Sequence, residues 1–271
     1  MNISKKYIAV LKMGLSDAFE YRFNFLMAVL LWYFPLIIDV LLWTLVYHSS
    51  GNKMIGGYTL NRMISYYIVT MIVSSMTSTE NIEWSVISDI KDGALQRHLI
   101  QPLNYQIFKL AYVLSKKVVV LVCILINMIP LLLLFRGYME IQLYPVNFLL
   151  FFLSLLLSLV IFFHIQVSIA MLSFWFTQFS SIFHFLPFIY AVLSGVAFPL
   201  NILPGWISNA LSFTPFYYVV FFPVQILTDG NITSDIIVKG FCIQSVWALL
   251  CVLLCKFVWV KGIQRFSATG G

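Results

Sequence analysis

Charged side chains are scarce in this chain. They make up 10% of the 271 residues, whereas 61% are hydrophobic, against about 25% and 45–50% in an average soluble domain. A water-soluble fold could not cover that much apolar surface. The hydrophobic residues also form long runs, and a run of about 20 apolar residues is enough to cross a ~30 Å hydrocarbon core. The composition therefore excludes a soluble domain and predicts an integral membrane protein surrounded by lipid.

The sequence also lacks the signatures of a self-contained enzyme. It contains no GxxxxGK[ST] phosphate-binding loop, no HExxH zinc helix and no GxSxG nucleophile elbow. The four cysteines, Cys123, Cys242, Cys251 and Cys255, fall inside apolar runs without CxxC or histidine spacing, which favours small buried side chains over metal ligands or disulfides. We expect no catalytic residue, no metal and no cofactor in this chain.

The long runs indicate helices. Barrel strands would alternate apolar and polar residues, whereas residues 121–134 and 148–163 are apolar on all sides. A helix also satisfies its own backbone, which lipid cannot do. We predict an all-α integral membrane protein, a single domain over residues 1–271. Polar breaks place six transmembrane helices near residues 24–47, 60–82, 110–135, 147–175, 179–200 and 236–259.

The distribution of lysine and arginine gives this bundle an orientation. Twelve of these residues lie on the side that holds both termini and four on the opposite side. Cytoplasmic segments carry the excess of positive charge, so both termini are expected in the cytoplasm of a multi-pass protein of the cell (plasma or inner) membrane. This topology accounts for the net charge of +6, and no nucleic-acid partner is needed.

The segment before the first span, residues 1–23, is amphipathic. Its apolar residues recur at helical spacing with charged residues between them, and they include Tyr7, Leu11, Leu15 and Phe19. This pattern favours a helix lying along the cytoplasmic interface. A solvated extension of the first span is the alternative.

The connection between the second and third spans, residues 84–106, combines charge with apolar side chains that a solvated turn would not need. The pattern predicts a short helix, a glycine break and a second short helix stopped by a proline. The residues that carry it are Ile87, Ile90, Gly93, Leu95, Leu99 and Pro102. Such a structure at the membrane face would suit the docking of a cytoplasmic partner; an ordinary intracellular hairpin is the alternative.

The external connection before the last span is long and too hydrophobic to be a solvated loop. Prolines interrupt helices, and tryptophan favours the membrane–water interface. We predict short re-entrant helices over residues 201–228, either beside a transport pathway or as a passive cap. The residues singled out in and before this segment are Gly195, Pro199, Pro204, Trp206 and Pro215.

Polar residues inside the spans are the remaining candidates, since an unpaired charge in lipid costs several kcal/mol. Asp39 is the one deeply placed acid; it could contact a substrate or couple protons, but pairing with an Arg or His of a neighbouring helix or second subunit is favoured. Asn127, His164 and Gln166 could line a pathway, although bonding across helix interfaces is favoured for each.

These three segments, in this order, resemble the permease subunits of ABC-2 type transporters. Gly93-Ala-Leu-Gln-Arg-His-Leu-Ile-Gln-Pro-Leu103 is similar to the family's G-x-L-x-x-x-L-x-x-P-L coupling segment. Ser194-Gly195, Phe198-Pro199 and Leu203-Pro204-x-Trp206 are similar to its SG…FP…LPxW signature. The last residues, 264–271, also look like the tail of a subgroup once described only as a family of unknown function.

The resemblance implies a half-transporter: two permease subunits, as a homodimer or heterodimer, driven by two separate cytoplasmic ABC ATPase subunits that bind ATP and Mg²⁺. The segment from Ile87 to Leu103 would sit in a groove of the ATPase. The candidate docking residues are Asp89, Lys91, Asp92, Arg97 and His98. The family mostly exports, and the apolar bundle favours an amphiphilic or hydrophobic cargo such as a peptide, an antibiotic or a lipid-like molecule.

Two further interpretations stay open from the residues alone. A membrane-embedded enzyme could be built around Asp39, His164 and His184, although these residues are expected at different depths. An ABC-coupled immunity or sensor subunit without bulk export would carry the same segments as an exporter.

Overall fold

The computed structural model describes residues 31–266, except 32, 52–53, 80, 102, 136, 139, 141–143, 177–181 and 231. Over this part of the chain the structure is helical and has no β-strand; one isolated bridge pairs Ile55 with Tyr58. The interfacial helix predicted for residues 1–23 lies outside the described residues.

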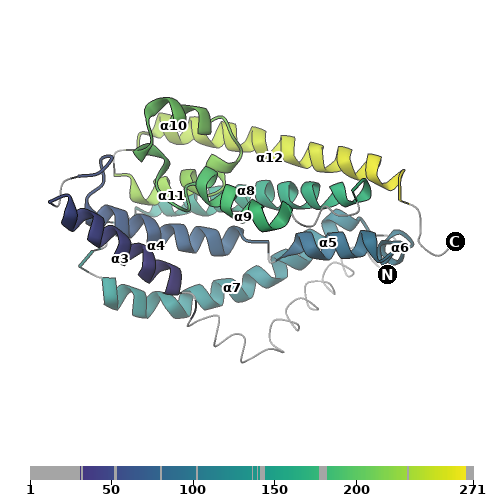
Figure 1. The fold of residues 1–271 in the computed structure, drawn as a ribbon, viewed down its shortest axis with the longest axis horizontal. Helices are drawn as coiled ribbons and strands as arrows, with labels where there is room; N and C mark the ends of the chain where they lie inside the picture. Colours follow the sequence, from purple (N-terminus) through teal and green to yellow (C-terminus); the bar gives the residue numbers. More distant parts are fainter. Residues whose placement is uncertain are drawn as a thin grey trace.

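The helices run along the long axis of an elongated bundle (Figure 1). In chain order they are α3 (Tyr33–Ser49), α4 (Leu60–Thr77), α5 (Ile82–Lys91), α6 (Leu95–Leu99), α7 (Tyr105–Phe135), α8 (Pro145–Ala170), α9 (Ile182–Ser194), α10 (Gly205–Leu211), α11 (Phe221–Thr228) and α12 (Ser234–Ile263). Three short 3-10 helices accompany them: η1 (Met171–Phe174), η2 (Leu200–Ile202) and η3 (Phe216–Tyr218).

Three described helical segments are long and apolar enough to cross a bilayer: α7, α8 continued by η1, and α12. α3 and α9 are apolar but shorter. The protein is thus an all-helical integral membrane protein, as expected, while the count of six spans stays a prediction. α7 begins at Tyr105 rather than near residue 110, and α12 continues to Ile263, because polar helix ends extend past the apolar stretch that hydropathy detects.

The outer surface of the bundle is apolar, as lipid contact requires. Large hydrophobic side chains are exposed along α3, α7, α8, α9 and α12. The cysteines form no disulfide; Cys251 and Cys255 are buried as predicted, but Cys242 is exposed on α12 and Cys123 is half-buried.

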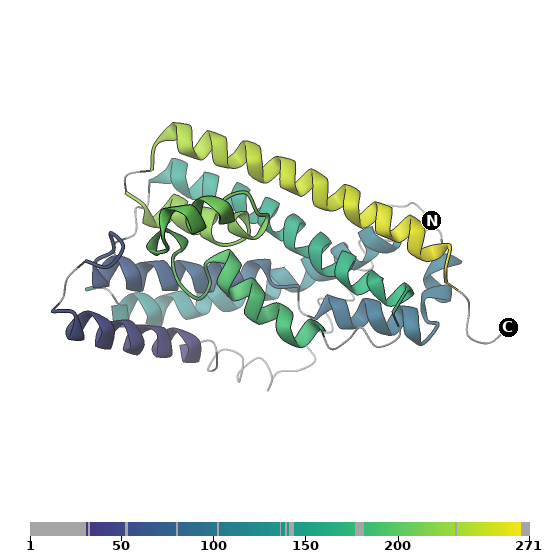
Figure 2. The ribbon, with the colours of Figure 1, turned by 45° about the horizontal axis from the view of Figure 1, so that its top comes forward.

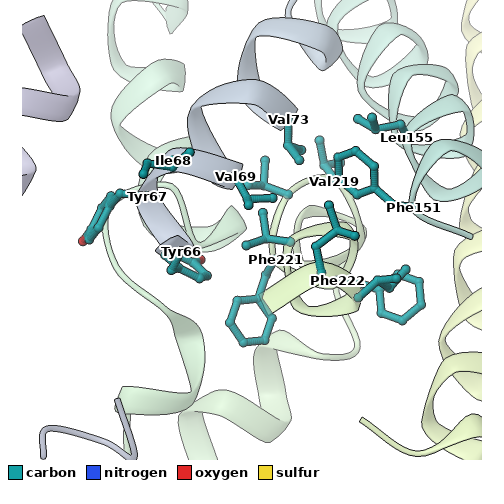
Figure 3. Close-up of a cluster of buried hydrophobic side chains, with 14 of the residues drawn as sticks. Tyr66, Tyr67, Ile68, Val69, Val73, Phe151, Leu155, Val219, Phe221 and Phe222 are labelled. Atoms are coloured by element: carbon teal, nitrogen blue, oxygen red, sulfur yellow. The ribbon is translucent and has the colours of Figure 1, made fainter. Parts of the chain in front are cut away.

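The main core lies where α4, α8, η3 and α11 meet. In Figure 3, the α4 side chains Tyr66, Val69 and Val73 face Val219 and Phe221 across this core. α11 is buried along nearly its whole length, so this short helix is an internal element of the bundle.

The two ends of the bundle differ in character. α5 and α6 lie at one end, beside the C-terminal end of α12, and α10 lies at the other (Figures 1 and 2). A second core cluster, formed by residues such as Val86, Leu95, Val113 and Phe163, packs α5 and α6 against α7 and α8. The predicted coupling region is therefore firmly joined to the long helices.

Candidate functional site

The predicted coupling region folds as a helix, a break and a second helix, which confirms the secondary structure expected from the sequence. α5 ends at Lys91 and α6 spans Leu95–Leu99. Gly93 between them has a φ of 72°, a left-handed conformation that glycine adopts without strain. Pro102, predicted to stop the second helix, lies outside the described residues.

A buried polar group ties this region to the start of α7. The Asp89 Oδ2 atom accepts a hydrogen bond from the Tyr105 hydroxyl at 2.7 Å and lies 2.6 Å from the Lys109 Nζ atom. Lys109 also donates to the Ser85 Oγ atom at 2.6 Å. Both Lys109 and Tyr105 are buried. We call Asp89, Tyr105, Lys109 and His98 the Asp89 cluster.

His98 completes this cluster from α6. Its Nε2 atom lies 4.0 Å from the Asp89 Oδ2 atom, and its ring packs against Tyr105 and Phe108 at centroid distances of 5.4 and 4.9 Å. Burial lowers the pKa of His98, while the Asp89 carboxylate acts in the opposite direction. Tyr105 in turn stacks on Trp259 of α12 at 4.9 Å. α5, α6, α7 and α12 therefore meet in one packed unit.

The predicted coupling residues fall into two groups. Ile87 and Leu95 are buried, and Asp89 and His98 turn toward α7, while Gly93 forms the turn. Other side chains face away from the bundle, and we call them the outward face: Lys91, Asp92, Arg97, Leu99 and Ile100. Ile100, which lies in the coupling-segment motif but was not among the candidate docking residues, is 84% exposed. A partner could reach the outward face directly. The buried and inward-turned side chains hold that face in position against the long helices.

The segment after α9 is fixed by two tyrosines of α4. The Tyr66 hydroxyl donates to the Gly195 carbonyl, and the Tyr67 hydroxyl donates to the Ala197 carbonyl at 2.7 Å. Gly195 has a φ of 85°, and a Cβ atom there would lie 2.8 Å from the Tyr66 hydroxyl and 3.1 Å from the Phe221 Cβ atom. Both the backbone conformation and the close approach require glycine at this position.

Each predicted proline of the external region stands immediately before a short helix. Pro199 precedes η2, Pro204 precedes α10 and Pro215 precedes η3, so the prolines start helices there as well as interrupting them. Trp206 on α10 is 75% exposed, in keeping with an interfacial position. The region is thus an exposed short helix, α10, joined to the buried α11.

Asp39 lines an open groove of about 550 Å³ between α3 and α4. Among the described residues, no Lys, Arg or His lies within ion-pair distance of its carboxylate. The favoured pairing with a neighbouring helix is therefore not found in this part of the chain, and pairing with a second subunit stays a prediction.

The other intramembrane polar residues are placed differently from one another. The Asn127 side-chain amide donates to the Cys123 carbonyl at 2.8 Å, and the His164 Nδ1 atom lies 2.7 Å from the Val160 carbonyl oxygen. Both bonds stay within one helix, and bonding of these side chains across helix interfaces stays a prediction. Gln166 lines a small cavity of about 100 Å³ between α8 and α9.

The residues proposed for an embedded enzyme do not gather into one site. His184 packs against Trp84 at a centroid distance of 5.8 Å, while Asp39 lines the groove beside α4. In the described part of the chain, no group of three His, Cys, Asp or Glu side chains is arranged to hold a metal ion.

Sequence reasoning missed a polar junction at Gln244 of α12. Its Nε2 atom donates to the Ser154 and Tyr218 carbonyls and to the Ser158 hydroxyl at 2.9–3.1 Å, and its Oε1 atom accepts from the Ser154 hydroxyl. Gln244 is fully buried. The junction joins α8, α12 and η3. Its signal in the sequence is a stripe of small residues on α12, Gly240, Ala248 and Cys251, which allows close helix packing.

Replacing this glutamine with leucine should therefore loosen the external region. In Gln244→Leu, the buried Ser154 hydroxyl loses its acceptor, while the Ser154 and Tyr218 carbonyls and the Ser158 hydroxyl each lose one of their hydrogen bonds. We expect a loss of about 2 kcal/mol of stability. The measurement is thermal unfolding of the purified protein in detergent. Val246→Leu, at an exposed position of the same helix, is the control and should change little. Equal melting temperatures for the two variants would contradict this role.

Glu83 on α5 is buried, and its Oε2 atom has no hydrogen-bond partner among the residues that the structure describes. Burial raises its pKa above the ordinary value of 4.5, partly opposed by a hydrogen bond to its own backbone. The native state therefore holds this proton more tightly than the unfolded state, so the wild type gains stability as the pH falls through the window between the raised pKa and 4.5.

Glu83→Gln should consequently be more stable than the wild type at pH 7.5, by about 1 kcal/mol, and the difference should shrink as the pH falls toward 4.5. Melting temperatures measured across this pH range check the prediction. A difference that stays constant with pH would show that the carboxylate charge is not its cause.

The fold and these sites define a class: an all-helical membrane protein, with the connection formed by α5 and α6 at one end and a short-helix region at the other. Residues 33–270 match the family model described as ABC-2 family transporter protein. The match covers most of the chain, and the chain belongs to the ABC-2 transporter family. This is a family of membrane permeases, whose members associate with ABC ATPases. A comparison with curated proteins gives no match.

Proposed function

We propose that this chain is the permease subunit of an ATP-driven ABC exporter. Two copies, or one copy and a related subunit, would form the membrane part, and separate cytoplasmic ATPase subunits would supply the energy. The six-span topology, with both termini in the cytoplasm of the cell membrane, belongs to this proposal. So does the assignment of residues 84–106 as the ATPase-coupling region.

The observation that carries the proposal is the outward face. It combines basic, acidic and apolar side chains, Arg97, Asp92 and Ile100 among them, on a segment that the Asp89 cluster holds against α7 and α12. A docking surface must be exposed, but it must also be rigidly connected to the helices it moves. This arrangement supports both requirements: force applied by a partner at α6 would reach the long helices through packed side chains.

The external region supports the transport role from the opposite end. α11 packs between α4 and α8 in the core, while the Gly195 and Ala197 carbonyls are bound by α4 tyrosines. A shift of α4 would therefore carry the external segment with it. The mostly apolar interior supports an amphiphilic or hydrophobic cargo.

The test is purification of the tagged protein from membranes of its own host. The isolated chain should hydrolyse no ATP, and the complex should contain a subunit with a GxxxxGK[ST] phosphate loop and hydrolyse ATP. Reconstituted vesicles should then move an amphiphilic cargo only when ATP is supplied on the side of the ATPase. Failure of any such ATPase to bind, with the permease folded, would contradict the proposal.

A further inference from the structure

The α3–α4 groove has the size and lining of a small-molecule site. Its volume of about 550 Å³ falls in the usual range for ligand pockets, which are mostly apolar with a few polar groups. Apolar side chains such as Leu36 and Met71 form much of the wall. Thr70 and Ser74 of α4 also line it, and their four-residue spacing places the two hydroxyls on one helix face. Ser78, which follows the last residue of α4, lines the groove as well.

Asp39 contributes a carboxylate to the lining of this groove. No described residue forms an ion pair with it. The nearby Tyr67 hydroxyl already donates to the Ala197 carbonyl and accepts a hydrogen bond from the Trp43 Nε1 atom at 2.7 Å. The ionised carboxylate is costly at such a position in a membrane protein unless a positive charge lies beside it. Among the described residues no Lys, Arg or His supplies that charge, so a bound cation would stabilise the ionised form.

A basic side chain, that of Lys117, contacts the groove wall at the end away from Asp39. The Lys117 Nζ atom of α7 donates to the Ser75 carbonyl at 3.1 Å and to the Ser78 hydroxyl at 2.9 Å. At 1.5 Å per residue, Ser78 lies about 16 Å along α4 from Tyr67, beside which Asp39 lies. Lys117 thus binds the end of α4, and in the described part of the chain the Asp39 end of the groove has a carboxylate with no basic side chain paired to it.

We propose that the α3–α4 groove binds a lipophilic organic cation, with Asp39 pairing the positive charge and the apolar wall covering the hydrophobic part. Complementary charge and an apolar lining together fit this class and disfavour an anion or a small hydrated ion. In the proposed exporter, the groove would be a binding site for cargo. This assignment as a cargo site rests on the proposed function. The binding itself does not depend on any ATPase.

The experiment measures equilibrium binding of tritiated tetraphenylphosphonium to the purified chain in nanodiscs, without nucleotide or ATPase. Asp39→Asn keeps the shape of the side chain and removes its charge; we expect binding at least ~10-fold weaker. Asp235→Asn removes the same charge from an exposed position at the start of α12 and should bind like the wild type. Neutral triphenylphosphine oxide should compete equally weakly in all three proteins.

A second variant keeps the test decisive if Asp39→Asn does not fold. Ser74→Phe leaves the acid in place and fills the groove, and it should also lose binding. Wild-type affinity in either folded variant would overturn the proposal. So would a wild-type protein that binds no cation and whose oligomer dissociates on Asp39→Asn, since Asp39 would then pair with a basic residue of another copy. If the protein binds the cation but no ATPase associates with it, the exporter proposal is contradicted while the cation-binding site is supported.

Discussion

Replacing Asp89 with alanine is expected to destabilise the protein by about 3 kcal/mol, a larger loss than we expect at Gln244 in the external junction. The substitution leaves the buried Lys109 ammonium and the Tyr105 hydroxyl without their shared partner. Removing one member of a buried ion pair is far more costly than removing both, because the remaining charge is desolvated and unpaired. The readout is thermal or chemical unfolding in detergent.

Asp92 provides a matched control three residues further along the chain. Its carboxylate accepts a hydrogen bond from the Ser88 hydroxyl at an exposed site, so Asp92→Ala should change the stability by no more than about 0.5 kcal/mol. Lys109→Met combined with Asp89→Leu should recover much of the loss, since neither charge then remains buried. Similar small effects of Asp89→Ala and Asp92→Ala would show that the cluster does not hold the segment.

The second large effect is expected on assembly. Arg97→Ser, Leu99→Ser and Ile100→Ser together should weaken binding of the ATPase subunit about 100-fold while leaving the melting temperature of the permease near that of the wild type. Arginine is enriched among the residues that dominate interface energy, and truncating one such residue can cost about 2 kcal/mol. With smaller losses from the two apolar side chains, a total of about 2.8 kcal/mol corresponds to the 100-fold change, since 1.4 kcal/mol is a factor of ten. The measurement is co-purification titrated by ATPase concentration.

Phe213→Ser supplies the control for that experiment. Phe213 is 77% exposed and follows shortly after α10. α10 lies toward the end of the bundle opposite α6 (Figure 1). Loss of a similarly exposed apolar side chain there should not change ATPase binding. If the triple variant still co-purifies with the ATPase like the wild type, the outward face is not part of the ATPase interface.

Much of the helical framework could be predicted from the sequence, because length and hydropathy dominate the physics of a membrane bundle. The break at Gly93 was also predictable, since few residues other than glycine adopt its backbone conformation. Helix ends were less accurate: α7 starts at Tyr105 because its first turns are amphipathic and pack on α5 and α12, outside the hydropathy signal.

The side-chain pairings could not be predicted in the same way, because they depend on the rotation of each helix against its neighbours. Asp89 was predicted only as a docking candidate. Its position three residues after the buried Val86 places it beside the buried face of α5, which is the signal that its side chain turns inward. The bonds from Gln244 to Ser154 and Ser158 required the register between α8 and α12, which no local pattern contains.

The most direct test of the proposed docking site is site-specific photocrosslinking at the outward face. A benzophenone side chain introduced at Ile100 should crosslink to the ATPase subunit in native membranes, and one introduced at Phe213 should not. Both positions are highly exposed, so reactivity alone cannot separate them. Crosslinking to the ATPase from Ile100 alone is the predicted result; no ATPase crosslink at Ile100, or an equal yield from Phe213, would contradict the assignment of residues 84–106 as the coupling region.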